Sequence, residues 1–403
     1  MTKLRILQVC PKTPFPPVDG GCIAANNITQ GLLNAGHTVK VMALSTVKHP
    51  AEASLADANY LAQTGFETCF IDTSVKPFAA ARHLFSNSSY NVQRFYSKPF
   101  EQMLLAALAR ESFDIVHFES AYTAPYLAAV RSVTDAPAVC RSHNMEYEIW
   151  QGSAELETNP LKKWYIGHLA RQLETYERRI ANEFNGIATI TAADEQTLRN
   201  IGCRVPIATI PFGMDVAGQS VAQHSDTPAV FHLGSMDWLP NQDGIRWLLD
   251  EVWPTVVAEF PTTKLYLAGR SMPQWLTQLN RTNVEIVGEV DDAFEFIGSK
   301  SIMVVPLHSG GGMRIKIVEG LALGKAIVST SLGAAGIDYT DEVNLMVADS
   351  AAAFADRIIR LLRDPQRCGE IAANARKLAL ETYDNARITD KLVEFYRGLD
   401  NPA

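Results

Sequence analysis

The chain has 403 residues, of which 47% are hydrophobic and 20% charged, so it is long enough for two globular domains that each bury a core. No run approaches the roughly 18 consecutive apolar residues of a membrane-spanning helix, and the first ten residues are typical of a buried strand rather than a signal peptide. The net charge of −8 belongs to the second half alone, because residues 1–212 carry 19 basic and 19 acidic residues and the remainder carries 17 and 25. The acidic half argues against nucleic acid as a partner, whereas the neutral first half can approach an anionic membrane surface.

The six cysteines lie apart in apolar contexts and form no Cys-x-x-Cys pair. This spacing argues against a disulfide framework and against a zinc site, and it predicts a reducing, cytoplasmic environment.

In the first half, strand-like apolar runs alternate with helical patterns, which predicts a parallel sheet joined by right-handed crossovers. The predicted strands are Leu4–Cys10, Thr38–Leu44, Thr68–Ile71, Asp114–Phe118, Ala138–Arg141, Gly186–Thr191 and Ile207–Ile210.

The loop after the first predicted strand contains four prolines and then Gly20 and Gly21, which open a predicted helix over Cys22–Leu33. A stiff loop in this place crosses the carboxyl edge of the sheet, where ligands of α/β proteins bind. The Gly-x-Gly-x-x-Gly fingerprint of dinucleotide-binding folds is absent, and no acidic residue ends the second strand at Leu44. The glycine pair therefore predicts either a turn that contacts a ligand or a turn with no catalytic role.

Residues 76–110 interleave basic and aromatic side chains. The basic residues are Lys76, Arg82, His83, Arg94, Lys98 and Arg110, and the aromatic ones are Phe78, Phe85, Tyr90, Phe95, Tyr96 and Phe100. Such a pattern suits docking on a lipid headgroup surface or on an anionic acceptor. A packed pair of helices with one solvated face produces the same pattern, so both interpretations remain open.

The motif Arg-Ser-His-Asn-Met-Glu-Tyr-Glu follows the fifth predicted strand and puts His143 at the carboxyl end of the sheet. Judged by itself, a single histidine in a strand-end loop is more often structural than catalytic. Asn144, Glu146 and Glu119 are weaker candidates for contacts with an acceptor. His117 falls inside a strand and is predicted to belong to the core.

A polar segment without periodicity, Met214–Pro228, separates the two halves and predicts a domain boundary. A second alternation of strands and helices follows it, which predicts two Rossmann-like domains. The predicted strands of the second half are Ala229–Leu233, Lys264–Ala268, Val284–Val287, Ile302–Val305, Ala326–Ser329 and Leu345–Val347.

The most informative stretch, Val305–Gly324, passes from a strand end through three consecutive glycines into a predicted helix over Met313–Leu323. Unpaired N–H groups and the dipole at a helix N-terminus attract an anion, and residues without Cβ let that anion approach the backbone. Arg314 and Lys316 follow in the predicted first turn, where two cations oppose the dipole unless an anion is bound. With Glu319 two turns into the helix, the arrangement suits a ligand with a diphosphate at one end and hydroxyl groups near a carboxylate, such as a nucleotide-sugar.

This stretch resembles the Glu-x7-Glu segment of glycosyltransferase family 4, whose members are retaining enzymes with the GT-B fold. Glu319 matches the second glutamate, which in the family binds the ribose hydroxyls of the donor. Gly311 stands in place of the first glutamate, so the chain is similar to a branch with the pattern Gly-Gly-Gly-x-Arg-x-Lys-x-x-Glu. In that branch we expect Arg314 and Lys316 to hold the diphosphate.

The resemblance implies roles for further residues. His143 is expected to contact the transferring sugar, Gly20 and Gly21 to lie near the donor phosphate and the acceptor, and backbone groups at 288–290 to hold the nucleotide base. The expected catalytic residues are His143, Arg314, Lys316 and Glu319, and the expected donor-binding residues are Gly288, Glu289, Val290, Gly310, Gly311, Gly312, Met313, Arg314, Lys316 and Glu319.

The resemblance also implies a domain organisation. An acceptor-binding domain is expected over residues 1–213 and a donor-binding domain over 214–384, with both parallel sheets facing an interdomain cleft. A C-terminal helix within 385–403 is expected to cross back to the first domain, as it commonly does in GT-B chains.

The resulting hypothesis is a retaining hexosyltransferase that uses a nucleotide diphosphate sugar and a hydroxyl acceptor (a glycan, a lipid-linked sugar or a small molecule) in polysaccharide or glycoconjugate synthesis, without a cofactor. The chain has no Asp-x-Asp pair, which in the other large glycosyltransferase fold holds a divalent metal, so a metal-independent site is expected. The enzyme is expected in the cytoplasm, with peripheral contact to the inner face of the membrane through residues 76–110. Two alternatives remain: a sugar-nucleotide epimerase on the same fold, and a non-catalytic protein that binds nucleotide-sugars.

Overall fold

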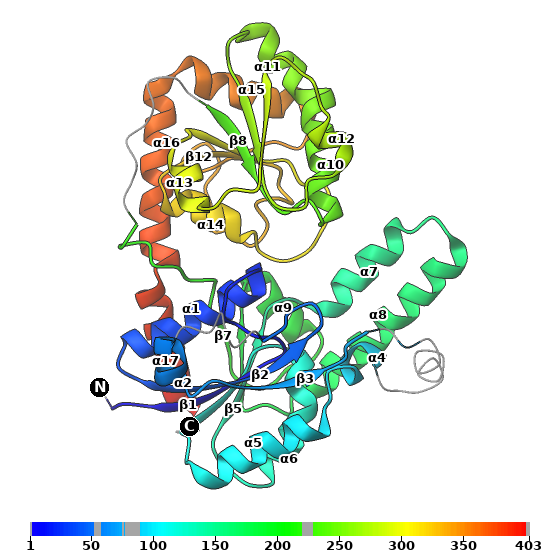
Figure 1. Ribbon diagram of the computed structural model, residues 1–403, viewed down its shortest axis with the longest axis vertical. Helices are drawn as coiled ribbons and strands as arrows, with labels where there is room; N and C mark the ends of the chain where they lie inside the picture. The colour runs from blue at the N-terminus through cyan, green and yellow to red at the C-terminus, as the bar shows by residue number, and fades with distance from the viewer. Residues whose placement is uncertain (1, 52–57, 75, 77–88, 220–228, 400–403) are drawn as a thin grey trace. The chain divides into compact units, whose positions relative to one another are not determined.

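The computed structural model describes residues 2–51, 58–74, 76, 89–219 and 229–399, and the chain divides into two compact units. Unit 1 comprises Met1–Gly213 and Ile388–Ala403, and unit 2 comprises Met214–Arg387 (Figure 1). Residues 77–88 of the basic and aromatic stretch and residues 220–228 of the predicted boundary segment lie outside the described residues.

Unit 1 contains a seven-stranded parallel sheet with the strand order β3-β2-β1-β4-β5-β6-β7. Its strands are β1 (Arg5–Cys10), β2 (Thr38–Thr46), β3 (Glu67–Ile71), β4 (Ile115–Phe118), β5 (Ala138–Ser142), β6 (Gly186–Thr189) and β7 (Ile207–Thr209). They are the seven strands that the sequence predicts, at nearly the same bounds. Because all of them are parallel, their carboxyl ends meet at one edge of the sheet.

Helices cover both faces of this sheet. They are α1 (Gly20–Asn34), α2 (Ala58–Thr64), α4 (Tyr90–Gln93), α5 (Lys98–Arg110), η1 (Ala121–Tyr126), α6 (Leu127–Arg131), α7 (Glu146–Leu156), α8 (Pro160–Ile180), α9 (Ala192–Asn200) and α17 (Asn385–Leu399). Alternation along β1 explains the two layers, because successive side chains of a strand point to opposite faces. Leu7 and Val9 pack with α5, α6 and α8, whereas Ile6 and Cys10 pack with α1 and α17. The C-terminal helix is thus part of the core of unit 1.

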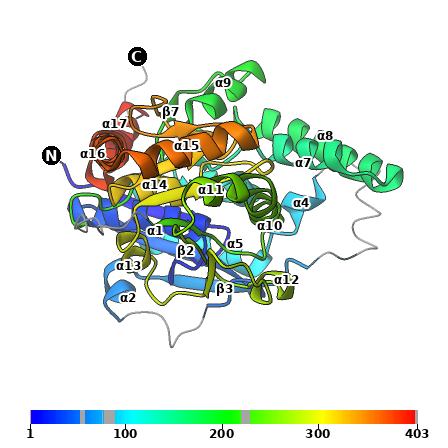
Figure 2. The same cartoon turned by 90° about the horizontal axis from the view of Figure 1, so that it is seen from above.

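Helices α7 and α8 form an antiparallel hairpin that extends away from the sheet of unit 1 (Figures 1 and 2). No side chain of α7 caps its N-terminus, but the buried carboxylate of Glu177 on α8 accepts hydrogen bonds from the backbone N–H groups of Glu146 at 3.0 Å and Tyr147 at 3.1 Å. Glu177 therefore fixes the first turn of α7, in which Glu146 lies.

Unit 2 contains a six-stranded parallel sheet with the order β10-β9-β8-β11-β12-β13. Its strands are β8 (Val230–Leu233), β9 (Leu265–Ala268), β10 (Val284–Gly288), β11 (Ile302–Val305), β12 (Ala326–Ser329) and β13 (Met346–Val347). Its helices are α10 (Leu239–Trp247), η2 (Leu248–Val252), α11 (Trp253–Glu259), α12 (Gln274–Thr277), α13 (Ala293–Gly298), α14 (Ile315–Ala322), α15 (Ala351–Arg363), α16 (Pro365–Leu378) and η3 (Ala379–Tyr383). The six strands predicted for the second half are all present, and two parallel α/β sheets confirm the predicted fold class. None of the described helices is both long and apolar enough to cross a membrane.

Candidate functional site

Unit 1 has a cavity of about 430 Å³ at the carboxyl edge of its sheet. Five residues that the sequence singles out line it: Gly21, Glu119, His143, Asn144 and Glu146. The residues that sequence reasoning did not assign to a site include Lys12, Thr46, Lys48, His49 and Tyr122. A signal for them was present, because each lies at or just beyond the carboxyl end of a predicted strand, where a parallel sheet collects its ligand contacts.

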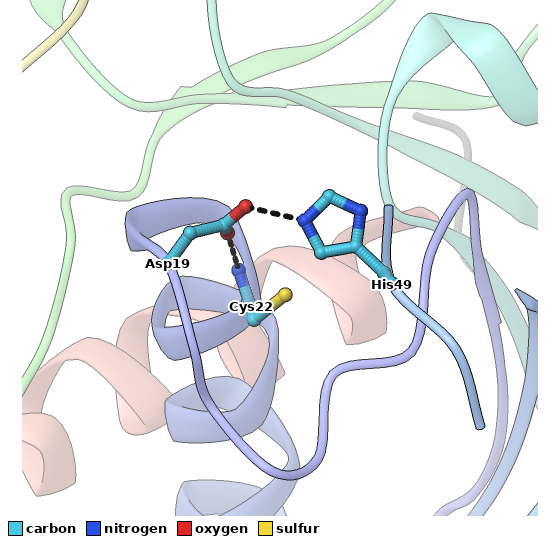
Figure 3. Close-up of side chains that lie close together, drawn as sticks. All are labelled: Asp19, Cys22 and His49. Atoms are coloured by element: carbon cyan, nitrogen blue, oxygen red, sulfur yellow. Dashed lines mark hydrogen bonds and ion pairs between the residues drawn. The ribbon is translucent and has the colours of Figure 1, made fainter. Parts of the chain in front are cut away.

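Asp19, at the start of α1, contacts three residues that line the cavity, Lys12, Cys22 and His49, and Figure 3 shows it with the last two. Its carboxylate accepts a hydrogen bond from the backbone N–H of Cys22 at 2.9 Å and thereby caps the helix. The same carboxylate pairs with the ammonium group of Lys12 at 2.6 Å and with Nε2 of His49 at 2.8 Å. Although burial favours the neutral acid, the His49 and Lys12 contacts hold the pKa of Asp19 well below its usual value.

The glycine pair has a local explanation at this place. Gly20 is the first residue of α1, and a Cβ on Gly21 would lie 2.8 Å from Nζ of Lys12, so a side chain there would push the lysine from its present position. Gly21 therefore lets the lysine reach Asp19. Gly21 lines the cavity, and contact of this turn with a ligand stays a prediction.

One group of potential metal ligands occurs among the described residues, and it is the same cluster: atoms of Asp19, Cys22 and His49 lie within 4.8 Å of one another. Lys12 already neutralises the carboxylate. Burial raises the pKa of Cys22 to about 11, so the thiol is protonated at neutral pH and is a poor ligand. A metal ion would have to displace both the ammonium group and the thiol proton.

Glu119 lines the cavity, although its side chain is only 1% exposed. One carboxylate oxygen, Oε2, is 2.8 Å from Nε2 of His143, and the other, Oε1, is 2.8 Å from Nε2 of Gln8 and 3.0 Å from Nε2 of His117. His117 is fully buried in β4, as predicted, but it is not an inert core residue because it binds Glu119. The structure therefore joins two candidates that the sequence treats separately, His143 and Glu119.

An aromatic wall lies beside His143 in the cavity. The rings of Phe95 and Tyr122 pack with centroids 4.8 Å apart, and the Tyr122 hydroxyl donates a hydrogen bond to Glu146 at 3.0 Å. Burial raises the pKa of Glu146, with the Tyr122 hydrogen bond acting in the opposite direction. Aromatic faces next to hydroxyl-binding groups are well suited to hold a small polar ring.

The described part of the basic and aromatic stretch has its cations engaged within unit 1. Arg94 donates to the carbonyl of Thr73 at 3.0 Å and lies over the ring of Tyr90, and Lys98 pairs with Glu101 on the same helix. These contacts are those of the packed-helix interpretation. Contact of residues 76–110 with a membrane stays a prediction.

In unit 2, the three glycines form a loop between β11 and α14 that requires two of them. Gly310 has φ of +103° and Gly312 has φ of +79°, both in the region that favours glycine. A Cβ on Gly310 would also lie 2.5 Å from the ring of Trp238. Gly311 is exposed.

The predicted start of the following helix is wrong by two residues, because α14 begins at Ile315 instead of Met313. Arg314 is the N-cap residue, with extended backbone angles of −88° and 97°, so only Lys316 lies in the first turn. The physical reason is a side-chain contact: the guanidinium of Arg314 folds back and donates to the carbonyl of Gly311 and to that of Gly310 at 2.9 Å. This closes the glycine loop before the helix starts.

Arg314 and Lys316 are held at the carboxyl edge of the sheet without a salt-bridge partner among the described residues. Arg314 is 7% exposed, its guanidinium lies 5.1 Å from the centre of the Trp238 ring, and its Nε has no hydrogen-bond partner. Lys316 donates to Oδ1 of Asn241 at 3.0 Å. Within the described ranges, no carboxylate oxygen lies within 4.0 Å of a nitrogen of either side chain.

His232 at the end of β8 is a neighbour of Lys316 that sequence reasoning missed. Its Nδ1 donates to the carbonyl of Val304 at 2.9 Å, and its buried Nε2 has no partner. A Cβ on Gly234 would lie 2.5 Å from Nζ of Lys316 and 3.0 Å from Nε2 of His232, so both groups converge on the space that this glycine leaves. Burial and the charge of Arg314 lower the pKa of Lys316 to about 7.

The remaining predicted donor residues lie around the same edge. Glu319 is in the second turn of α14, three residues after Lys316, and burial raises the pKa of its carboxyl against the pull of that lysine. Gly288 ends β10 with φ of +81°, and its carbonyl accepts from the N–H of Gly269 at 2.8 Å. Glu289 and Val290 follow it, and Met313 lies half-buried between the glycine loop and Arg314.

Two family models match consecutive parts of the chain: that of Glycosyltransferase Family 4 at residues 18–217, and that of Glycosyl transferases group 1 at residues 227–364. The chain belongs to glycosyltransferase family 4. The family resemblance drawn from Val305–Gly324 is confirmed, and the protein is a glycosyltransferase.

This glycosyltransferase has curated relatives of low identity. It is 25% identical over 69% of its length to an uncharacterized 44.6 kDa protein in the cps region of Klebsiella pneumoniae, of which the match covers 73%. It is 24% identical over 98% of its length to a phosphatidyl-myo-inositol mannosyltransferase of Mycolicibacterium smegmatis, with 93% of that protein covered.

Solved structures of glycosyltransferases share its fold. Sucrose-phosphate synthase from Thermosynechococcus elongatus superposes with a TM-score of 0.72 at 16% identity, with 99% of each chain covered. Anabaena HepE in complex with UDP gives 0.67 at 15% identity, with 98% of this chain and 100% of that chain covered. These similarities confirm the predicted GT-B fold.

Proposed function

We propose that the protein transfers a hexose from a nucleotide diphosphate sugar to a hydroxyl acceptor with retention of the anomeric configuration. One observation carries the donor assignment: Arg314, which is buried, and Lys316, which is half-buried, lie beside a glycine loop, and neither cation forms a salt bridge with a carboxylate of the described residues. Burying an uncompensated charge is costly, so a site of this kind is completed by an anion. A diphosphate supplies that anion and can replace the loop carbonyls as the partner of Arg314.

The strand order supports a nucleotide that extends along the carboxyl edge of unit 2. The loop after β10 and the glycine loop after β11 are separated by β9 and β8. Three strand spacings amount to about 14 Å, which an extended nucleoside diphosphate can bridge. In this proposal the backbone at 288–290 holds the base, Glu319 binds the ribose hydroxyls, and Gly310, Gly311, Gly312 and Met313 surround the diphosphate. The HepE complexes with UDP and with UDP-glucose support a donor of this class.

The cavity of unit 1 is the proposed site of the acceptor and of the sugar being transferred. His143 would contact the transferring sugar, and Asn144, Glu146 and the aromatic wall would hold the acceptor. The acceptor hydroxyl attacks the anomeric carbon on the face from which the diphosphate departs, and a diphosphate oxygen takes the hydroxyl proton. Arg314 and Lys316 stabilise the charge on the leaving group, so the chemistry needs neither a cofactor nor a protein nucleophile.

The relatives suggest two acceptor classes to test first. One relative is encoded in a cps region, and the others are named phosphatidyl-myo-inositol mannosyltransferases. A glycan and a lipid-borne hydroxyl are therefore the primary candidates, the second of which would bring the cytoplasmic enzyme to the inner face of the membrane.

A thermal-shift screen of UDP-, GDP- and dTDP-sugars tests the donor assignment, because a ligand that binds the folded state raises the melting temperature. The donor that gives the largest shift is then supplied, radiolabelled in the sugar, with phosphatidylinositol vesicles or with a glycan mixture. Transfer with retained configuration is expected. A donor that turns over rapidly without any acceptor, or that binds but is never transferred, would contradict the proposal.

A further inference from the structure

The carboxylate of Glu119 has no role in the proposed transfer, yet several hydrogen bonds hold it beside the cavity. Three side chains from different parts of unit 1 bind it at 2.8–3.0 Å: Gln8 from β1, His117 from β4 and His143 from the loop after β5. Gln8 is itself held by the hydroxyl of Thr29, which donates to Oε1 of Gln8 at 2.6 Å. The carboxylate is therefore fixed in position from several sides.

The contacts of Glu119 determine where the protons of both histidines lie. An ionised carboxylate can only accept hydrogen bonds, so Nε2 must carry the proton in His117 and in His143. Burial by itself would raise the pKa of Glu119, but the two histidines outweigh it and hold this pKa well below its usual value. The carboxylate is thus ionised throughout the neutral range. Because Nε2 of His143 contacts Glu119, Nδ1 is the ring nitrogen of His143 that does not face this carboxylate.

The far end of the network reaches the C-terminal helix. The buried hydroxyl of Tyr396 on α17 is 2.6 Å from Nδ1 of His117. Because burial raises the pKa of Tyr396 well above its usual value, the phenol stays protonated and donates a hydrogen bond to Nδ1 of His117. His117 consequently offers Nε2–H to Glu119, and the chain of hydrogen bonds from Tyr396 through His117 points toward the carboxylate.

Backbone strain marks the same place. Ser120, directly after Glu119, has φ of +115°, a backbone conformation that residues other than glycine rarely adopt and that costs about 1–3 kcal/mol. Such strain persists only where the surroundings enforce it. Here it turns the chain at the end of β4 while Glu119 keeps its hydrogen bonds to Gln8, His117 and His143.

A purely structural explanation would make Glu119 the counter-charge of Arg141, which is also fully buried. Their closest approach, from Nε of Arg141 to Oε2 of Glu119, is 3.9 Å, and Nε of Arg141 has no hydrogen-bond partner. The same oxygen lies 2.8 Å from His143. The contacts of Glu119 are therefore those of a hydrogen-bond acceptor for histidine and not those of a close ion pair with Arg141.

We propose that Glu119 is the positioning residue of His143: it holds the imidazole ring by Nε2–H, so that Nδ1 accepts a hydrogen bond from a hydroxyl of the sugar being transferred. This inference rests on the proposed role of His143 in sugar transfer. Glu119 itself does not touch the substrate. Its loss should impair the turnover step, while the nucleotide diphosphate, which is bound by residues of unit 2, keeps its affinity.

A mutant cycle tests this inference with Glu119→Gln, His143→Ala and the double variant. We expect Glu119→Gln to lower kcat about 10-fold or more, with the affinity for the nucleoside diphosphate changed less than about 2-fold. The double variant should be no slower than His143→Ala alone, because Glu119 acts through that ring. Glu101→Gln is the matched control, since Glu101 is also a buried carboxylate of unit 1 but binds Lys98 and Tyr96, and it should leave kcat unchanged.

Effects of Glu119→Gln and His143→Ala that multiply in the double variant would overturn the inference. If His143→Ala leaves transfer intact, the proposed role of His143 is wrong, and the inference falls with it. A preparation that transfers no sugar from any donor would instead refute the proposed function alone, because the proton position can be measured without activity.

That measurement uses the wild-type protein with ¹⁵N-labelled histidine and requires no transfer activity. Nine histidines contribute signals, and the spectrum of His143→Ala identifies the one of interest. We expect the neutral His143 ring to carry its proton on Nε2. A proton on Nδ1 would overturn the inference.

Discussion

The charged groups at the two candidate sites differ in their surroundings between unit 1 and unit 2. In unit 1, Glu119 is surrounded by donors, and each of its oxygens accepts at least one hydrogen bond. In unit 2, Arg314 and Lys316 are close together with only carbonyl and amide oxygens as partners. A charge whose hydrogen bonds are complete within the protein can hold other groups in place, whereas a charge left without a counter-charge is prepared for a ligand. The difference assigns positioning to the first cluster and binding to the second.

The largest effect is expected for Arg314→Ala, which removes the main proposed diphosphate contact. Nucleotide diphosphate affinity should fall by about 2–4 kcal/mol, or roughly 30- to 1,000-fold. Calorimetry measures it. Arg246→Ala is the control, because this exposed arginine also lies over a tryptophan, with 3.9 Å to the ring centre of Trp275, but outside the cluster. An equal loss of affinity in Arg246→Ala would show that the effect of Arg314→Ala does not come from the cluster of Arg314 and Lys316.

Lys316→Met is expected to reduce nucleotide diphosphate affinity about 10- to 100-fold, since one charge-assisted contact is lost. The ligand-free variant should nevertheless be more stable, with a melting temperature about 2–4 °C higher, because a half-buried cation that forms no salt bridge has been removed. Scanning calorimetry with and without nucleotide checks both signs. A variant that binds weakly and also melts earlier would indicate that Lys316 is structural.

The pKa of about 7 for Lys316 makes binding depend on pH. A diphosphate favours the ammonium form, so the pKa rises in the complex and binding takes up a proton between the two values. Affinity should therefore fall as pH rises above 7, by at most about 10-fold per pH unit. Titration calorimetry in buffers of different ionisation enthalpy measures the proton uptake, which should vanish in Lys316→Met.

The stability of the ligand-free protein should show the opposite trend for the same group. An unfolded lysine titrates near pH 10.4. Between about 7 and 10.4 the unfolded chain binds more protons at Lys316 than the folded chain, so this residue destabilises the fold most below pH 7 and progressively less above it. The stability advantage of Lys316→Met over wild type should accordingly shrink as the pH rises, which denaturant titrations at several pH values can follow.

The smallest effect is expected for Tyr396→Phe, at the end of the Glu119 network. Losing the donor to Nδ1 of His117 should cost about 1 kcal/mol of stability and lower kcat only about 2- to 3-fold. Two residues, His117 and Glu119, separate Tyr396 from His143, and the cavity itself is unchanged. A loss of kcat as large as that of Glu119→Gln would extend the positioning role to α17.

The sequence predicts the architecture well because its signals are local. Apolar runs of the right length mark all thirteen strands, and a strand that ends in a loop at the carboxyl edge already places Gly21 and His143 on the side where ligands bind. The glycine loop and its two cations are visible for the same reason, since all lie within seven consecutive residues. Even there the helix start was wrong, because a side chain of the loop itself, Arg314, closes the turn.

Only the tertiary structure decides which groups that are distant in the sequence form hydrogen bonds or interact through their charges. Gln8, His117 and His143 come from three separate segments and meet at Glu119, Tyr396 joins them through His117, and no local sequence pattern predicts these contacts. His232 likewise reaches Lys316 from another strand. The sequence determines the parallel sheets, the edge on which the site lies and the family, because periodicity and short motifs depend on neighbours in the chain. The protonation state and the partners of each buried charged group depend on its neighbours in space, which are brought together only when the chain folds.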